Sequence, residues 1–168
     1  GASALAANTT GANQTVIGSG AASSTTTGTA NTVVGRVALN ANTTGSSNVA
    51  VGYQAMQNSD GVSNNTAVGT AALLANIGNN NAAFGFNALN ANISGSQNVA
   101  IGNNALGALT TTSGNIAVGY QALDAGVDGV QNCIGIGSAA LGALTASGGT
   151  TGTAPSIAIG YNCLAGAV

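Results

Sequence analysis

Residues 48–56 read NVAVGYQAM, and closely similar nine-residue stretches return further along the chain. The later copies are NTAVGTAAL, NAAFGFNAL, NVAIGNNAL and NIAVGYQAL, which begin at Asn65, Asn81, Asn98 and Asn115. Each copy places a Gly after an apolar triplet and is followed by a stretch rich in Asn, Ser, Thr, Gly and Ala. Self-similarity at a fixed period is typical of proteins that stack one structural unit. The chain is therefore expected to stack copies of one unit rather than to fold around one irregular core.

The Gly that follows the triplet defines the period of the repeat. Successive spacings are 17, 17, 17, 16, 17, 17, 18 and 23 residues, and the last one includes residues 142–155, a predicted loop insertion before the final coil. Residues 1–168 are therefore expected to form a single repeat domain of about nine coils of 17 residues. The repeat glycines are Gly18, Gly35, Gly52, Gly69, Gly85, Gly102, Gly119, Gly137 and Gly160.

The residues around each Gly predict strands. The residue just before it is large and apolar, and the residue three before it is mostly β-branched, so both suit one face of a strand. Four residues after the Gly there is usually a Leu, which predicts a second strand, and the polar remainder predicts a return loop. The pattern thus predicts an all-β fold, a parallel β-solenoid with two sheets. The predicted structural core is the residue before each Gly: Ile17, Val34, Val51, Val68, Phe84, Ile101, Val118, Ile136 and Ile159.

The position two before the Gly is small and apolar in most copies. It points to the opposite face of the strand from the large residues. A sheet with one wet face should alternate apolar and polar residues, whereas a sheet covered on both faces is apolar throughout. We therefore expect this row to face another copy of the chain as an oligomer face. Its residues are Ala50, Ala67, Ala83, Ala100, Ala117 and Ala158.

An Asn lies four residues before the Gly in six consecutive copies. In a stack of coils these amides are expected to form a hydrogen-bonded ladder along the axis. Such a ladder needs no ligand to satisfy its polar groups, which favours a structural role over ligand binding. The ladder residues are Asn31, Asn48, Asn65, Asn81, Asn98 and Asn115.

The composition excludes several classes of function. The chain has one Arg, three Asp and a net charge of −2, with no Lys, Glu or His. Binding to nucleic acid needs clustered Lys and Arg, and a membrane-spanning helix needs about 18 or more apolar residues in a row. Neither nucleic acid nor membrane insertion of this segment is therefore expected. Without His, Glu or Lys, a Ser or Cys nucleophile lacks its usual activating base, so the chain is expected to be no enzyme.

The remaining polar candidates favour structural interpretations. Asp124 and Asp128 are the only carboxylates close in sequence, and they fall in a return loop, where capping of turn backbone is favoured over an acid–base pair. Calcium-binding solenoids repeat an Asp in every coil, so no repeated metal site and no cofactor are expected. Cys133 and Cys163 are interpreted as small buried hydrophobes, with an interchain bridge as the alternative.

A row of aromatic residues directly follows the repeat Gly. An exposed row of this kind can grip glycans, and edge packing between coils is the alternative interpretation. The aromatic residues are Tyr53, Phe86, Tyr120 and Tyr161, and they alternate with Arg36, Thr70, Asn103 and Ser138.

The run N-x-A-[VI]-G-x-x-A-L resembles the head repeats of trimeric autotransporter adhesins, and it is also similar to repeats of bacteriophage tail fibres. Residues 65–73 and 115–123 fit it most closely, and the resemblance covers residues 31–141 well. It implies a left-handed parallel β-roll that associates as a parallel homotrimer. It also implies a structural and adhesive fibre module, extracellular on a cell surface or virion, with a host-surface glycan or protein receptor as a partner besides the chain itself.

The alternative from a different class is an ice-binding β-solenoid. Flat arrays of Thr and Ala on stacked coils suit that role. The Thr row of this chain, Thr15, Thr32 and Thr66, argues against it, because Val and Ile interrupt the row and it is expected to share the inward face.

Overall fold

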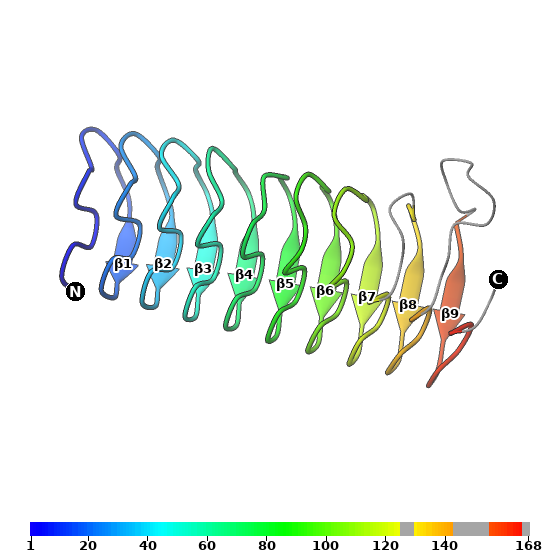
Figure 1. Ribbon diagram of the computed structural model, residues 1–168. Coiled ribbons are helices and arrows are strands. Elements are labelled where there is room, and N and C mark those ends of the chain that lie inside the picture. Colours follow the sequence, from blue (N-terminus) through cyan, green and yellow to red (C-terminus); the bar gives the residue numbers. More distant parts are fainter. Residues whose placement is uncertain (125–129, 143–154, 166–168) are drawn as a thin grey trace.

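In the computed structural model of the chain, nine short strands stack along one axis, and the chain between them wraps round to one side (Figure 1). The structure describes residues 1–124, 130–142 and 155–165. Within these ranges the strands form one parallel sheet in sequence order, which confirms the predicted all-β parallel solenoid. The strands are β1 (Thr15–Ile17), β2 (Thr32–Val34), β3 (Val49–Val51), β4 (Thr66–Val68), β5 (Ala82–Phe84), β6 (Val99–Ile101), β7 (Ile116–Val118), β8 (Ile134–Ile136) and β9 (Ile157–Ile159).

The register of the sheet stacks each repeat position on its own copies. Ala67 pairs with Ala83, and Val68 pairs with Phe84, although this interval is 16 residues rather than 17. The loops absorb such differences, so the sheet stays in register from β1 to β9. The predicted loop insertion at residues 142–155 falls almost entirely outside the described ranges.

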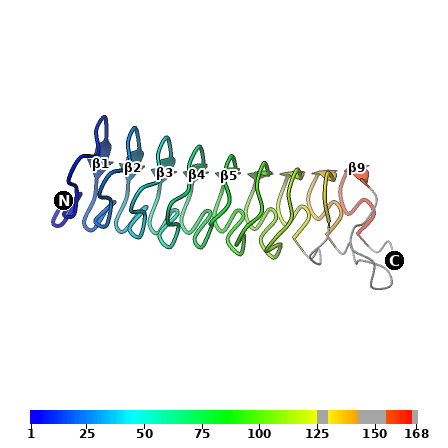
Figure 2. The same ribbon diagram turned by 90° about the horizontal axis from the view of Figure 1, so that it is seen from above.

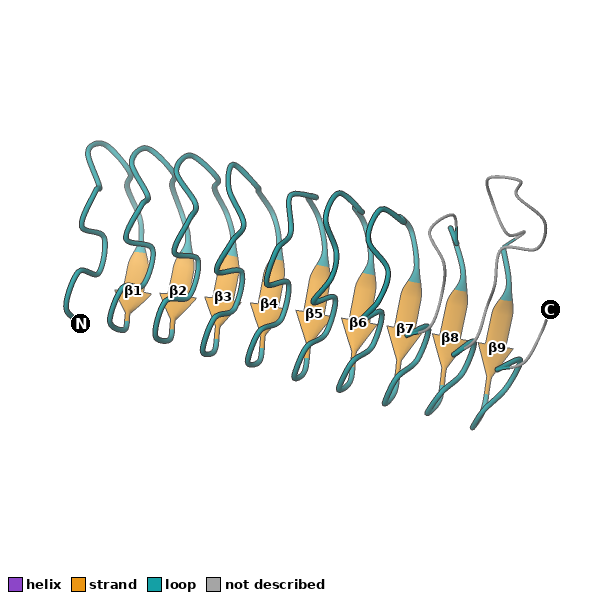
Figure 3. Ribbon diagram, viewed as in Figure 1, coloured by secondary structure: helices purple, strands orange, loops and turns teal. Residues whose placement is uncertain are grey.

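The expected second sheet does not form in the described residues, so that prediction is wrong. After each strand the chain makes a succession of turns, and Figure 3 shows strands on one side of every coil only. The second and fourth residues after the Gly have left-handed backbone, as at Gln54 (φ 60°) and Met56 (φ 53°). This turn wall is nevertheless bonded from coil to coil, since the Met56 N–H donates to the Ala72 carbonyl at 3.0 Å. Left-handed backbone costs about 1–2 kcal/mol at a non-Gly residue, so the surrounding packing must impose it.

The structure also corrects the assignment of the two faces of the strands. In β6, Ala100 is fully buried, whereas its neighbour Ile101 is 42% exposed. The predicted core residues lie on the outer face of the sheet, half-buried or exposed: Ile17, Val34, Val51, Val68, Phe84, Ile101, Val118, Ile136 and Ile159. The residues predicted as an oligomer face lie in the interior instead: Ala50, Ala67, Ala83, Ala100, Ala117 and Ala158.

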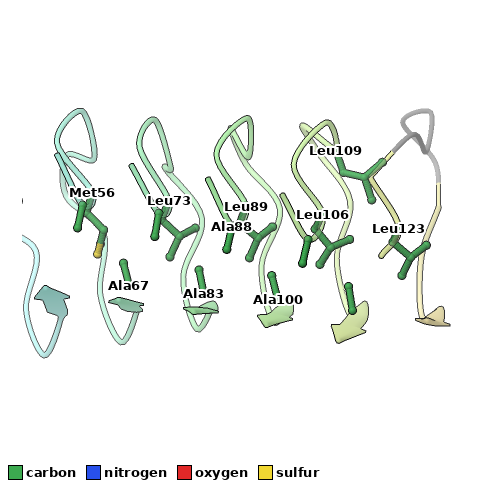
Figure 4. Packing of buried hydrophobic residues seen from close by; sticks show 14 of the residues in the cluster. Met56, Ala67, Leu73, Ala83, Ala88, Leu89, Ala100, Leu106, Leu109 and Leu123 are labelled. Atoms are coloured by element: carbon green, nitrogen blue, oxygen red, sulfur yellow. The ribbon is translucent and has the colours of Figure 1, made fainter. Parts of the chain in front are cut away.

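The physical reason for this inversion is the narrow interior of the coil. Figure 4 shows Ala67, Ala83 and Ala100 pointing from the sheet toward the large side chains of the turn wall. Because interiors are packed as densely as organic crystals, a coil filled by a Leu from one wall has room only for a small side chain from the other. The large side chains of the strands therefore point outward. The large buried side chains four residues after the repeat Gly are Leu39, Met56, Leu73, Leu89, Leu106, Leu123 and Leu141.

The repeat Gly forms the corner between the sheet and the turn wall. At Gly85 the backbone has φ 137°, which side chains disfavour, and an added Cβ would lie 2.5 Å from the carbonyl oxygen of Gly102 in the next coil. Successive corners thus touch through bare backbone. The repeat Gly is required both for its conformation and for the close stacking of the coils.

Candidate functional site

The first and third residues of the strands form a continuous outer face along the solenoid. This outer face runs from Thr15 and Ile17 in β1 to Ile157 and Ile159 in β9, and Figure 2 shows the strands aligned along one side of the stack. Ile17 and Ile159 are 60% and 68% exposed. Eight steps between neighbouring strands give a strip about 38 Å long. Long apolar strips of this kind on soluble proteins mark interaction surfaces.

Three threonines are the polar residues of the outer face. Thr15 and Thr32 are exposed and Thr66 is half-buried, and all three occupy the first position of their strands. The expectation that they share the inward face is wrong, because the inward position of each strand is its second residue. Their side chains lie on the N-terminal half of the strip, and from β5 onward the same position holds Ala, Val or Ile.

The residues that directly follow the repeat Gly form a second exposed row beside the sheet. We call Tyr53, Phe86, Tyr120 and Tyr161 the aromatic row; their exposed fractions are 43%, 51%, 54% and 83%. They follow β3, β5, β7 and β9, which is every second strand. The Arg36 guanidinium carbon lies 5.6 Å from the centroid of the Tyr53 ring, so side chains in this position reach from one coil to the next.

The six Asn residues form a buried ladder with two kinds of hydrogen bond. In each step the backbone N–H of one Asn donates to the side-chain oxygen of the Asn in the preceding coil, as from Asn98 to Asn81 at 3.0 Å. The side-chain amide of Asn81 in turn donates to the Gly95 carbonyl in the next coil at 2.9 Å. The amide groups thus satisfy backbone groups where the chain enters each strand. These hydrogen bonds stabilise the fold, and because the Asn side chains are buried, an external ligand cannot reach them.

Sequence analysis missed a second set of buried Asn residues. Asn42 donates to the Gly45 carbonyl and accepts from the Gly45 N–H, both at 3.0 Å. Asn92 makes the corresponding bond to Gly95 at 2.9 Å and also donates to Asn76 at 2.5 Å. In the sequence these residues could have been recognised as an Asn that lies three residues before a second Gly, which occurs less regularly in the return loops. These residues close the return loops inside the solenoid.

Cys133 ends the Asn ladder. It is buried at the Asn position of its coil, and its N–H donates to the Asn115 side-chain oxygen at 3.0 Å. Its Sγ lies 3.5 Å from the Gln131 carbonyl oxygen. Cys163 is half-buried, and both thiols are free in the single chain. The geometry agrees with the interpretation of Cys133 as a small buried side chain.

The two carboxylates that the structure describes, Asp60 and Asp124, lie in different coils. Hydrogen bonds from the side chain and the N–H of Thr43 hold the pKa of Asp60 below its usual range. Partial burial raises the pKa of Asp124, against a hydrogen bond from the Gly107 backbone. Asp128 lies outside the described residues. In the described ranges no three His, Cys, Asp or Glu side chains gather where they could hold a metal ion.

Comparison of the chain with protein-family models, with curated proteins and with solved structures finds no match. Among the residues that the structure describes, no helix has the length and apolar character needed to cross a bilayer. The outer face and the aromatic row are therefore the features from which a function can be argued. Both offer apolar contact and ring stacking to a partner.

Proposed function

We propose that the chain is a non-catalytic structural and adhesive module of a fibre displayed outside the cell, on a cell surface or virion. In this proposal about nine coils form a left-handed roll, and three parallel copies pack side by side as a homotrimer. The resemblance of the repeat supports the trimer and the handedness. The observation that carries the proposal is the outer face, a largely apolar strip about 38 Å long whose polar residues are Thr15, Thr32 and Thr66.

The occupant that suits this strip is a second copy of the chain. The outer face keeps one register from β1 to β9, so parallel copies place identical coils at the same height. A net charge of −2 over 168 residues leaves little electrostatic repulsion between copies. Cyclic packing covers the strip on every copy and closes the assembly. The interface proposed here is the row of Val, Ile and Phe side chains; the row of Ala residues at the second strand position is excluded from it by its burial.

Light scattering with matched charge variants tests the proposal. Val51→Glu, Ile101→Glu and Val118→Glu together place carboxylates along the outer face. The control combines Thr27→Glu, Thr44→Glu and Ser94→Glu, which adds the same charge on exposed return loops. We expect the wild type and the control to be oligomers and the outer-face variant to be a monomer with an unchanged far-UV circular dichroism spectrum. A monomeric wild type, or an outer-face variant of unchanged mass, would contradict the proposal.

Ice binding is a second candidate, and the outward Thr residues favour it. Thr15, Thr32 and Thr66 lie on a regular sheet whose strands repeat every ~4.8 Å, a suitable base for ordered water. A thermal-hysteresis assay separates the two candidates. Activity that disappears in a Thr15→Lys/Thr32→Lys/Thr66→Lys variant would favour ice binding, whereas no hysteresis in the wild type excludes it.

A further inference from the structure

The aromatic row has a regular spacing that packing between coils does not require. Rings in neighbouring coils could pack on one another if the aromatic residues followed every strand, but they follow β3, β5, β7 and β9. Since adjacent strands lie about 4.8 Å apart, consecutive aromatic residues are spaced by roughly 9.6 Å. The rings therefore form separate platforms along the axis.

Polar residues occupy the same position in the coils between these platforms. Thr70 follows β4, Asn103 follows β6 and Ser138 follows β8. Thr70 and Asn103 are exposed, and Ser138 is half-buried. A ligand that lies along the row thus meets a ring and then a hydroxyl or amide group in strict alternation.

The side chains that directly follow the repeat Gly are long enough to bridge neighbouring coils, so a ligand along the row can contact successive coils. The contact between Arg36 and the Tyr53 ring spans one step of this row, with 5.6 Å from the guanidinium carbon to the ring centroid. Arg36 is the only Arg of the chain, and it lies at the N-terminal end of the row. From Tyr53 to Tyr161 the row itself contains no charged residue, which suits an uncharged ligand.

We propose that the aromatic row binds a linear, uncharged β-1,4-linked polysaccharide laid along the solenoid axis. In such a chain each pyranose advances by about one strand spacing, and successive pyranoses are turned over relative to each other. Every second sugar therefore offers the same apolar C–H face, and these faces stack on the rings of the aromatic row. Thr70, Asn103 and Ser138 hydrogen-bond to the hydroxyl groups of the intervening sugars.

This inference names a partner for the adhesive role proposed above and rests on that role for its biological setting. It does not depend on the oligomeric state, since the aromatic row lies beyond the Gly corner and outside the residues of the outer face. The assembly proposal fails if the wild type is a monomer or if the outer-face variant keeps the mass of the wild type. This inference fails if a wild-type chain of oligomeric mass binds neither β-1,4-linked polymer.

Co-sedimentation of the full chain with microcrystalline cellulose and with chitin tests the inference, with cross-linked dextran as an α-linked control. We expect the wild type to bind at least one of the two β-1,4-linked polymers and to leave dextran unbound. The variant Tyr53→Ala/Phe86→Ala/Tyr120→Ala should bind at least about tenfold more weakly, as is usual when aromatic anchors are truncated. Wild-type chain that binds neither β-1,4-linked polymer would overturn the proposal.

A spacing variant separates the proposed geometry from general adsorption of aromatic surface. Thr70→Phe/Phe86→Asn keeps the number of aromatic residues but moves one ring by one coil. It should lose binding by a similar factor, while its circular dichroism spectrum and mass stay those of the wild type. Binding equal to that of the wild type would show that the alternation is irrelevant and would overturn the proposal.

Discussion

The sheet and the turn wall of each coil differ in the size of the side chains that they point into the interior. The sheet sends small side chains inward, such as Ala83, and large ones outward, such as Phe84. The turn wall sends large side chains inward, such as Leu89, and carries both aromatic and polar residues outward, such as Phe86 and Asn103. What packing fixes in a narrow solenoid is the combined volume of the two facing side chains. A large side chain on one wall therefore requires a small one on the other.

This division gives the two sets of large apolar residues different roles. The leucines of the turn wall from Leu39 to Leu141 are buried within a single chain, and they stabilise their coils by the hydrophobic effect. The Val, Ile and Phe residues of the outer face remain partly in contact with water in a single chain. In the assembly proposed above a second copy would complete their burial, so assembly and folding would depend on different residues.

The corner between the two walls should be the most sensitive position. Gly85→Ala forces a Cβ against the Gly102 carbonyl at a backbone φ of 137°, and it should lower the free energy of unfolding by about 4 kcal/mol. Gly61→Ala is the control, because Gly61 has φ 66° and its added Cβ would lie 3.8 Å from the nearest other atom, Thr44 Oγ1. The control should cost about 1 kcal/mol. Equal losses in urea denaturation would mean that the corners are not in close contact.

Truncation of one large residue on each wall compares the walls directly. Leu89→Ala leaves a cavity in the interior and should cost about 3 kcal/mol. Phe84→Ala removes a side chain that is 40% exposed, and in the monomeric outer-face variant it should cost below about 1 kcal/mol. The measurement is urea denaturation of both proteins in that monomeric background. A larger loss for Phe84→Ala than for Leu89→Ala would reverse the assignment of the two walls.

The Asn ladder should show a moderate effect. Asn81→Ala removes the acceptor for the Asn98 N–H, which leaves a buried backbone donor unpaired, and it removes one of the two donors to the Gly95 carbonyl, to which Asn92 still donates. A loss of about 2 kcal/mol is expected. Asn103→Ala changes an exposed Asn that directly follows the repeat Gly of the next coil and should leave the melting temperature nearly unchanged. If both variants melted alike, the ladder would contribute little to stability.

The smallest effects concern the two described carboxylates, and they should have opposite signs. The pKa of Asp60 is lowered in the folded state, so its contribution to stability is present above the unfolded pKa and is lost as the pH falls through the folded pKa. The pKa of Asp124 is raised, so the folded state gains stability as the pH falls through its folded pKa toward the unfolded value. At pH 7, Asp60→Asn should therefore slightly lower the melting temperature and Asp124→Asn should slightly raise it. If calorimetry showed melting temperatures shifted in the same direction by both variants, the environments described for Asp60 and Asp124 would be wrong.

The sequence predicts the period, the parallel sheet and the Asn positions because each of these follows from repetition along the chain. Alternation along a strand also shows correctly that Ala100 and Ile101 point to opposite faces. It does not show which face is inside, because that depends on how much of the interior the opposite wall fills. The sequence also predicts a second strand where the structure has the turn wall, because local residue preferences do not reveal the backbone conformation found there. Val37 (φ 51°) and Leu39 (φ 48°) adopt a backbone conformation that such residues rarely take alone.

The most direct test of the inverted faces is the stability of two neighbouring substitutions, Ala100→Asp and Ile101→Asp. Ala100→Asp places an unpaired carboxylate in the interior, and we expect the chain to lose several kcal/mol of stability or to fail to fold. Ile101→Asp places the same group on the outer face, and a dilute solution should keep the wild-type far-UV circular dichroism spectrum and a similar melting temperature. The opposite result, a folded Ala100→Asp chain and an unfolded Ile101→Asp chain, would contradict the placement of the small residues inside and the large ones outside.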